Sequence, residues 1–388
     1  MCRITPHPPG LALRRPSLRS LLGALAACAA SLSLVACATL PSEGGEGSVP
    51  NAHAGPFREI DQEELGSSRV APHVMEDDDR FARDASVIDL DGDPSTLAVA
   101  GFFAATLHAE GAAPDPLAPP NAIVRHDAAD GRSFARSSVT VLAPELPWEG
   151  GVVAAPSALL VRGEIWLYYA AEGGIGLARS ADGAAFEREP APVLAPLASD
   201  EGSWERGAIP GSPGVVRLPD GSFRMFYAVA SDGDASSVGE ARSDDGVVWE
   251  RVGGGPALAP ASRSGAGALA GEGEPFDSVA VLDPAPVLAV STTGRASLRV
   301  YYAARDSAGR SAIGLAARWG HDGPLQRAVA PVFGASSALA PRAPWVTVYP
   351  GFSLLFVTQA AGTREGQGYP AVAAGVAPAD AALPPRTP

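Results

Sequence analysis

The chain alternates between apolar and polar residues in short runs, and one run recurs along it. The phrase "IGLARSADGAAFER" occupies residues 175–188, and "VGEARSDDGVVWER" repeats its order at 238–251. A period of two predicts half-buried strands, and "ADG" and "DDG" are typical of tight hairpin turns. Related copies lie at 121–136 and 312–327, with a weaker one at 371–380. The phrase therefore indicates a repeated strand, turn and strand.

Two further runs precede each copy. The nearer one is an apolar strand with paired aromatics or their equivalents, centred on Phe102, Tyr168, Phe226, Tyr301 and Phe356. The earlier one begins near Asp84, Ala155, Ser212 and Ala285, and short turns such as "RGE" and "PDG" join it to the aromatic run. No segment keeps a helical period. The unit is therefore four short strands, written five times.

This repeat predicts an all-β fold, namely a five-bladed β-propeller of four-stranded blades. Each blade has two apolar faces that only neighbouring blades can cover, so the pattern must repeat and the ring must close. We expect the propeller to span residues 69–380, with "RVAPHVM" at 69–75 as the outer strand of the last blade and a tail at 381–388. Three aromatics are expected to be buried between blades: Tyr169, Tyr227 and Tyr302.

The N-terminal region has the features of an export signal. Four arginines precede an apolar run at residues 21–36, which is short for a membrane span. The run ends in "LVAC", which resembles a bacterial lipobox, and this resemblance implies a signal peptide at 1–36 and a lipid on Cys37. A flexible tether at 37–68 would then hold the protein to the cell envelope, at the outer membrane. The alternative is an ordinary secretory signal cut near Ala38.

Composition excludes several kinds of chemistry. The chain has no lysine, which excludes a lysine Schiff base and a Walker-type phosphate loop. Its formal net charge of -14 argues against nucleic acid as a partner. All three cysteines lie in the first tenth of the chain, so the body has no disulfide and no thiolate metal site. We expect no cofactor and no metal.

The blade phrase resembles that of the five-bladed propellers of the arabinanase, levansucrase and invertase group, glycosyl hydrolase families 43 and 32. The residues that carry the resemblance are Pro156, Gly163, Tyr168, Tyr169, 175–178, Ser180, Asp182, Gly183, Phe186 and 192–196. The resemblance implies a glycan-acting, furanosidase-like enzyme that inverts configuration. The alternative is the six-bladed sialidase type, whose Asp boxes have one more residue between Asp and Gly.

The resemblance also implies a site at the centre of the ring, where carboxylates from different blades face each other. Asp84 stands where the group keeps its catalytic base. Ser212 stands where a carboxylate that tunes pKa is expected. Asp283 lies one or two residues out of register in the fourth blade, where Asp277 is a further candidate. Glu274, with Glu272 beside it, is a candidate for the acid.

Two other motifs have a functional and a structural interpretation. "WEGG" at Trp148–Glu149 and "WERG" at Trp204, Glu205 and Arg206 could bind a sugar through an aromatic ring and a carboxylate. A motif that recurs in each blade is also typical of a structural corner. "DLDGD" at 89–93 looks like a calcium loop, but its place in the repeat favours a hairpin turn.

Two functions from different classes therefore remain open. One is a glycoside hydrolase, and the other is a non-catalytic propeller that binds a glycan or a protein at the envelope. The pattern of residues indicates neither a particular sugar nor an oligomeric state.

Overall fold

The computed structural model describes residues 54–61, 64, 81–91, 96–109, 112, 115, 118–134, 138–198, 203–230, 235–262, 274–290, 296–334, 340–364, 367–381 and 383. The predicted signal peptide, Cys37 and Glu272 lie outside these residues. Within the described part, no helix is both long enough and apolar enough to cross a membrane.

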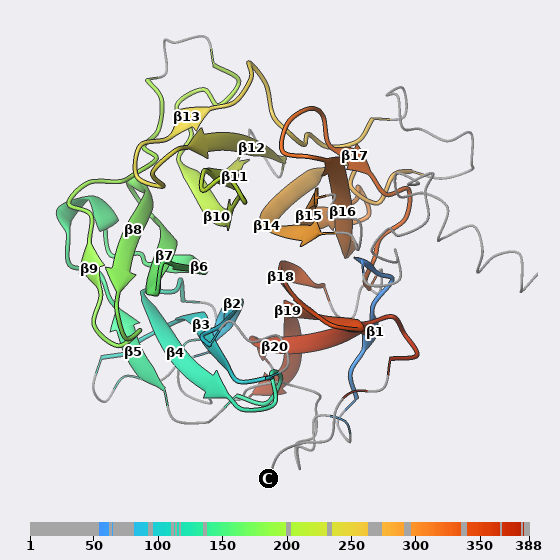
Figure 1. Ribbon diagram of the computed structural model, residues 1–388, viewed down its shortest axis with the longest axis horizontal. Helices are drawn as coiled ribbons and strands as arrows, with labels where there is room; N and C mark the ends of the chain where they lie inside the picture. Colours follow the sequence, from blue (N-terminus) through green and yellow to red (C-terminus); the bar gives the residue numbers. More distant parts are fainter. Residues whose placement is uncertain are drawn as a thin grey trace, which may run out of the picture.

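The described chain is almost entirely β-strand and forms five blades around a central axis (Figure 1). Blades one and two contain β2 (Arg83–Asp89), β3 (Val99–Ala105), β4 (Ala122–Ala128), β5 (Val139–Leu142), β6 (Ala154–Val161), β7 (Glu164–Ala171), β8 (Gly174–Ser180) and β9 (Glu187–Arg188). Blades three and four contain β10 (Pro210–Arg217), β11 (Phe223–Ala230), β12 (Ser236–Ser243), β13 (Glu250–Arg251), β14 (Ala280–Val290), β15 (Ala296–Arg305), β16 (Ser311–Trp319) and β17 (Gln326–Arg327). The fifth blade contains β18 (Arg342–Tyr349), β19 (Phe352–Arg364), β20 (Gln367–Ala377) and β1 (Arg58–Glu59). The predicted five-bladed propeller is thus confirmed.

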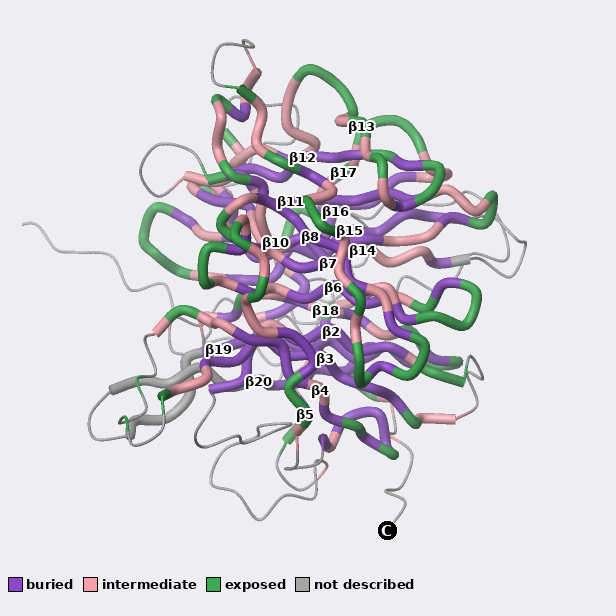
Figure 2. Tube along the Cα trace, turned by 90° about the vertical axis from the view of Figure 1, so that its left-hand side faces the viewer, coloured by how far each residue is buried: buried purple, intermediate pink, exposed green. Residues whose placement is uncertain are grey.

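Each blade is an antiparallel sheet whose first strand lies nearest the axis. These inner strands are β2, β6, β10, β14 and β18. A short 3₁₀ helix, η2 (Pro147–Glu149), precedes β6. One parallel pair, Ser236 with Ala280, joins the edges of blades three and four. In side view, buried segments run through the middle of the ring, and exposed segments lie mainly at the turns (Figure 2).

The ring is closed by β1, which pairs with β20 through Arg58–Val376 and Glu59–Gly375. The backbone N–H of Ile60 also donates to the carbonyl of Ala374 at 2.9 Å. The closing strand predicted from the sequence, 69–75, lies outside the described residues, whereas β1 belongs to the segment 37–68 that the sequence predicts as a tether. The propeller therefore begins earlier than predicted. Only antiparallel pairing with β20 reveals this, because two residues are too few to show an alternating pattern.

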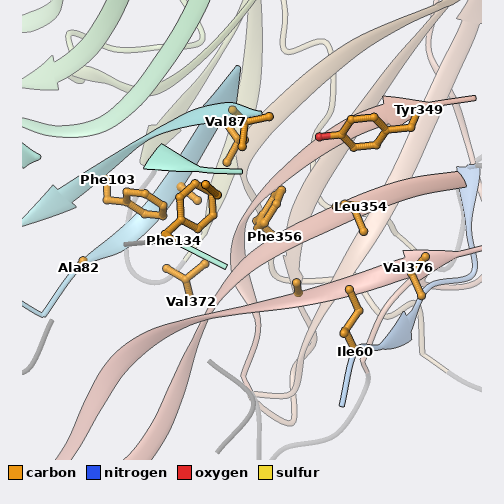
Figure 3. Close-up of a cluster of buried hydrophobic side chains, with 14 of the residues drawn as sticks. Ile60, Ala82, Val87, Phe103, Phe134, Tyr349, Leu354, Phe356, Val372 and Val376 are labelled. Carbon is orange, nitrogen blue, oxygen red and sulfur yellow. The ribbon is translucent and has the colours of Figure 1, made fainter. Parts of the chain in front are cut away.

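The core consists of apolar side chains between adjacent blades. Figure 3 shows the cluster between blades five and one, where Phe103 and Phe134 lie edge to face with their centroids 5.0 Å apart. Tyr169, Tyr227 and Tyr302 are at most 1% exposed, which confirms their predicted burial.

These tyrosines explain why one glycine recurs in the repeated phrase. In blade two, a Cβ at Gly176 would lie 2.4 Å from the ring of Tyr169. Gly239 with Tyr227 and Gly314 with Tyr302 repeat the same distance. Only glycine leaves room for the ring on the adjacent strand, so the glycine and the tyrosine recur together.

Candidate active site

Every inner strand has the same distortion close to its first residue. One residue there has a left-handed backbone, with φ of 54° at Asp84, 46° at Ala155, 42° at Ser212, 48° at Asp283 and 47° at Ala343. The strand register shifts at each of these positions, as in a β-bulge. A left-handed backbone is unfavourable for residues with a Cβ, by roughly 1–2 kcal/mol each, so the surrounding ring must impose it.

These five residues line a cavity at the axis, together with the residue that follows each one and Trp345. The cavity is small, with a volume of about 30 Å³. Most of its described wall is alanine and proline: Ala85, Ala155, Pro156, Pro213, Pro284, Ala343 and Pro344. Asp84, Asp283 and Ser212 are the polar side chains of that wall. The two predicted carboxylates of blades one and four therefore share one cavity.

Asp84 is held by the fifth blade. Its backbone N–H donates to the hydroxyl of Thr358 at 2.7 Å, and that hydroxyl donates to Oδ1 of Asp84 at 3.2 Å. Thr358 itself is buried, at 1% exposed. The carboxyl group of Asp84 is half-buried and borders the cavity. The residue predicted as the base thus lies in the predicted place.

Asp283 links three blades. The hydroxyl of Ser212 donates to its Oδ1 at 2.8 Å, and the backbone N–H of Ala343 donates to its Oδ2 at 3.1 Å. The sequence pattern places Asp283 one or two residues out of register, with Ala285 as the equivalent of Asp84. The structure corrects this, because Asp283 has the same left-handed backbone as Asp84, at the bulge that all five inner strands share. Ala285 is equivalent to Ser86.

The surroundings of Asp283 disfavour its charge. Burial raises the pKa of its carboxyl group, and the negative charge of Asp84 raises it further. The hydrogen bond from Ser212, the charge of Arg342 and the N–H of Ala343 oppose this shift without cancelling it. A pair of carboxyl groups in which one resists ionisation is the arrangement that acid and base catalysis requires.

The raised pKa of Asp283 predicts a measurable effect of pH on stability. Folding favours its protonated form, so its contribution is fully present below the ordinary aspartate pKa of about 3.9 and is lost as the pH rises through the higher folded value. Asp283→Asn is neutral at every pH. The free energy of unfolding of wild type minus that of the variant should therefore fall as the pH rises from about 4 to 7. Denaturant titrations at several pH values measure this difference, and a constant difference would contradict the assignment.

Glu149 and Glu205 do not reach the cavity, contrary to the sugar-binding interpretation. Glu149 is 0% exposed and accepts hydrogen bonds from Tyr169 at 2.7 Å and from two backbone N–H groups. Glu205 is 2% exposed, accepts from Tyr227 at 2.7 Å, and forms an ion pair with Arg251 at 2.9 Å. No carboxylate oxygen of either is available to a ligand in this arrangement.

The same contact exists in blade four, where Tyr302 donates to Asp277 at 2.9 Å and Arg327 pairs with it. Trp148 stacks on Tyr169 with its centroid at 6.0 Å, and Phe276 stacks on Tyr302 at 6.5 Å. In blade two, Arg188 lies 3.3 Å from Glu149, so an acid, a tyrosine and an arginine form a structural corner in three blades. We revise the expectation for Trp148, Glu149 and Glu205 accordingly.

The remaining predicted residues lie outside the cavity wall. Trp204 is half-buried and packs against the core between blades two and three. Arg206 is exposed in the turn before β10. Glu274 is also exposed, and its carboxylate accepts from Ser278 at 2.7 Å and from Ser307. Neither Arg206 nor Glu274 is therefore positioned beside Asp84 and Asp283.

In the turn that resembles a calcium loop, the carboxylates of Asp89 and Asp91 accept hydrogen bonds from nearby residues of the same segment. The N–H of Asp91 donates to Asp89 at 3.0 Å, and the hydroxyl of Thr96 donates to Asp91 at 2.9 Å. Among the residues that the structure describes, no three acidic, histidine or cysteine side chains form a metal site.

Sequence reasoning missed two residues of the site, Thr358 and Trp345. Neither residue lies beside a candidate catalytic residue in the sequence. The signal for Trp345 was its place in the repeat, two residues after Ala343, where the other blades have small residues.

Five blades, inner-strand bulges and an axial cavity define the chain as a five-bladed β-propeller. No family model matches the chain, and no curated protein matches it.

Solved structures do match the fold. A thermostable family-43 glycoside hydrolase is 15% identical with a TM-score of 0.53, covering 76% of this chain and 89% of that one. An α-L-arabinofuranosidase from Lactobacillus brevis is 12% identical with a TM-score of 0.52, covering 78% and 91%. A structure from the GH130 family of mannoside phosphorylases, which contains glycoside hydrolases, is 15% identical with a TM-score of 0.54, covering 85% and 96%. At these identities the likeness shows a shared fold.

Proposed function

We propose that this protein acts on glycans at the mouth of its axial cavity, as a glycoside hydrolase in which Asp84 and Asp283 are the catalytic carboxyl groups and the cavity itself has room only for water. One observation carries the proposal: two carboxyl groups from different blades line the same cavity, and the pKa of one of them is raised. Glycoside hydrolysis needs one protonated and one ionised carboxyl group on either side of the bond. The architecture shared with known glycosidases supports this choice.

In this mechanism Asp283 gives its proton to the oxygen of the leaving sugar as the glycosidic bond breaks. Asp84 takes a proton from a water molecule, whose oxygen bonds to the anomeric carbon on the opposite face of the ring. Water is consumed, one bond is exchanged, and the configuration inverts. The hydroxyl of Ser212 and the N–H of Ala343 then stabilise the carboxylate that Asp283 becomes.

The walls of the cavity favour a neutral sugar. Two carboxyl groups line it, and its described lining has no cationic side chain. Because Asp283 is the proton donor, a uronic acid would place a second negative charge beside that of Asp84, at a cost that rises in a partly dry site. Neutral glycans are therefore the substrates to test first.

A specific observation favours a second candidate, a propeller that binds glycans without cleaving them. Both oxygens of Asp283 already accept hydrogen bonds within the protein, and Ser212 replaces the third carboxylate that the resemblance implies. The purified protein should be assayed for product release from arabinan, xylan, fructan, mannan and aryl furanosides, with calorimetry on the same panel. Product release supports the hydrolase. Saturable binding without product supports the binding propeller, and no binding at all contradicts both.

We also propose that the protein is exported and anchored by a lipid on Cys37, as the "LVAC" motif suggests. Cys37→Ser should abolish lipid attachment and release the protein from the membrane fraction, because the thioether-linked lipid requires the cysteine sulfur. Metabolic labelling with a fatty acid, followed by fractionation, measures this outcome. Cys28→Ser, in the same apolar run, is the matched control and should behave like wild type. A Cys37→Ser protein that is labelled and fractionates normally would contradict the proposal.

A further inference from the structure

Blade five extends further than the other blades at the end of the ring where the inner strands begin. The strand register shows this, because the residue before each left-handed residue pairs with a residue of the second strand of its blade. In four blades the second strand ends one or two residues after that partner, at Ala105, Ala171, Ala230 and Arg305. In blade five the partner of Arg342 is Thr358, and β19 continues from there to Arg364.

The extension is a two-stranded ribbon, formed by residues 359–364 of β19 and 367–371 of β20. Its pairing runs from Gln359 with Ala371 to Arg364 with Gln367. About six residues of strand span roughly 20 Å, so the ribbon projects well beyond the first residue of β18. Among the strands that the structure describes, none pairs with either edge of the ribbon.

The ribbon begins beside the two candidate catalytic carboxyl groups. Thr358, the last residue before it, accepts the backbone N–H of Asp84 at 2.7 Å and donates to its Oδ1 at 3.2 Å. Arg342, opposite Thr358, precedes Ala343, whose N–H donates to Asp283 at 3.1 Å. A glycan whose cleaved bond lies at the mouth of the cavity therefore has the ribbon on its blade-five side.

Neither strand propensity nor a protein partner explains the length of this ribbon. Residues 359–371 read QAAGTREGQGYPA, with three glycines, one proline and no large aliphatic residue. Such a segment is a poor strand former and offers little to a hydrophobic protein interface. Ala374 offers its carbonyl to Ile60 on the outer edge of β20, and alternation along the strand puts Pro370 on that same edge. Pro370 lacks the N–H that a further strand would need, so the edge is protected from pairing with another chain.

We propose that the ribbon is an accessory surface that binds the part of a neutral glycan chain beyond the sugar at Asp84 and Asp283, a role that rests on the proposed function. The axial cavity has room only for water, so the glycan must make its contacts at the mouth. The ribbon is the longest projection of the described strands there. Its sequence supplies hydroxyl, amide and guanidinium groups, which form hydrogen bonds with sugar hydroxyls. The protein then favours oligosaccharides and polysaccharides over a single sugar with a small leaving group.

A shortened ribbon tests this role. Ala361 and Tyr369 are directly paired, so residues 362–368 can be replaced by Asn-Gly, which favours a two-residue hairpin turn. The comparison is made in the Asp84→Asn background, which leaves the ligand uncut. The affinity of the shortened variant for a hexasaccharide should fall about tenfold, the equivalent of ~1.4 kcal/mol, and its affinity for a disaccharide should stay within about threefold.

Blade three provides the matched control at the same end of the ring. Ala230 and Ser236 are also directly paired, so Asn-Gly in place of residues 231–235 makes the same kind of turn. Because β11 ends at Ala230 and has no such extension, this change should leave the affinity for both sugar lengths unchanged.

Hydrogen exchange provides a second measurement that needs no change in the ribbon. In Asp84→Asn with an intact ribbon, a bound hexasaccharide should slow amide exchange in peptides from residues 359–371. A bound disaccharide should not, because it is too short to reach from the two carboxyl groups along the ribbon.

Calorimetry with arabinose, xylose, mannose and fructose oligosaccharides of both lengths gives the affinities, and sedimentation gives the oligomeric state. A loss confined to the hexasaccharide supports the role of the ribbon, whether or not the protein shows turnover. Unchanged affinity, equal losses for both lengths, or a hexasaccharide that leaves exchange in the ribbon unchanged overturns it while the glycan function stands. A dimer that the shortened ribbon converts to monomers also overturns it, because the ribbon would then join two copies of the chain. If the protein with an intact ribbon binds none of these sugars, the proposed function fails, and the role of the ribbon fails with it.

Discussion

Asp84→Asn should reduce the turnover of a glycan about 100-fold or more, the usual effect of removing a general base. The amide has almost the same shape as the carboxylate, and its Oδ1 can still accept the hydrogen bond from Thr358. The fold and the affinity for the glycan should therefore persist while water is no longer deprotonated. Initial rates at saturating substrate, with the melting temperature as a check on folding, measure this outcome.

The leaving group separates the roles of the two carboxyl groups. Asp283→Asn removes the proton donor, so natural glycans should suffer most and aryl glycosides with acidic phenols least, because such phenols leave without protonation. Asp84→Asn should slow both kinds of substrate alike. Asp244→Asn, an exposed residue of the β12–β13 hairpin outside the cavity wall, is the matched control and should have wild-type rates. Normal rates in Asp84→Asn would remove it from the mechanism.

Glu205→Ala should cost about 3 kcal/mol of stability, because it removes one partner from a buried ion pair. The change leaves the hydroxyl of Tyr227 without its acceptor and Arg251 without its carboxylate. Burial and the neighbouring Glu205 raise the pKa of Tyr227, so its hydroxyl stays a donor across the physiological range. Urea unfolding of the two proteins measures the difference.

Glu250→Ala is the matched control for this change. Glu250 also pairs with an arginine in blade three, Arg242, but both side chains are more than half exposed. Exposed pairs contribute about 0–1 kcal/mol, so the control should lose little. Affinity for the glycan should be unchanged in both variants. Equal losses of stability would contradict the structural role of Glu205. A loss of affinity in Glu205→Ala alone would restore the sugar-binding interpretation of the corner.

The blades could be predicted from the sequence because the same packing constraint recurs in several blades and therefore repeats the same residues. Gly176 and Tyr169 recur as a pair since the glycine leaves space for the ring, and such local constraints leave a visible phrase. Asp84 could be predicted from its resemblance to a known motif. The register of Asp283 could not, because Ala285 and Pro286 resemble Ala155 and Pro156 of blade two, and a shift of two residues leaves the alternation unchanged.

Other parts of the site depend on contacts that no local pattern records. Glu205 and Glu149 look like ligand-binding carboxylates until Tyr227 and Tyr169 are seen to use their oxygens. Trp345 lies in a strand with no local signal of function, and only the closed propeller places it in the lining of the cavity that also contains Asp84. Contacts between blades are long-range in sequence, and they decide which of two similar residues faces the axis.

The pairing of β1 with β20 also determines the order in which the molecule can be completed. Arg58 meets Val376, so the first strand of the described chain waits for the last one. Hairpins within blades one to four need only nearby residues and can form during synthesis. The final blade cannot close until β20 has been synthesised. Until then the apolar face of blade one that packs against blade five stays exposed. A nascent or truncated chain is therefore open to aggregation through an apolar surface that is buried in the closed propeller.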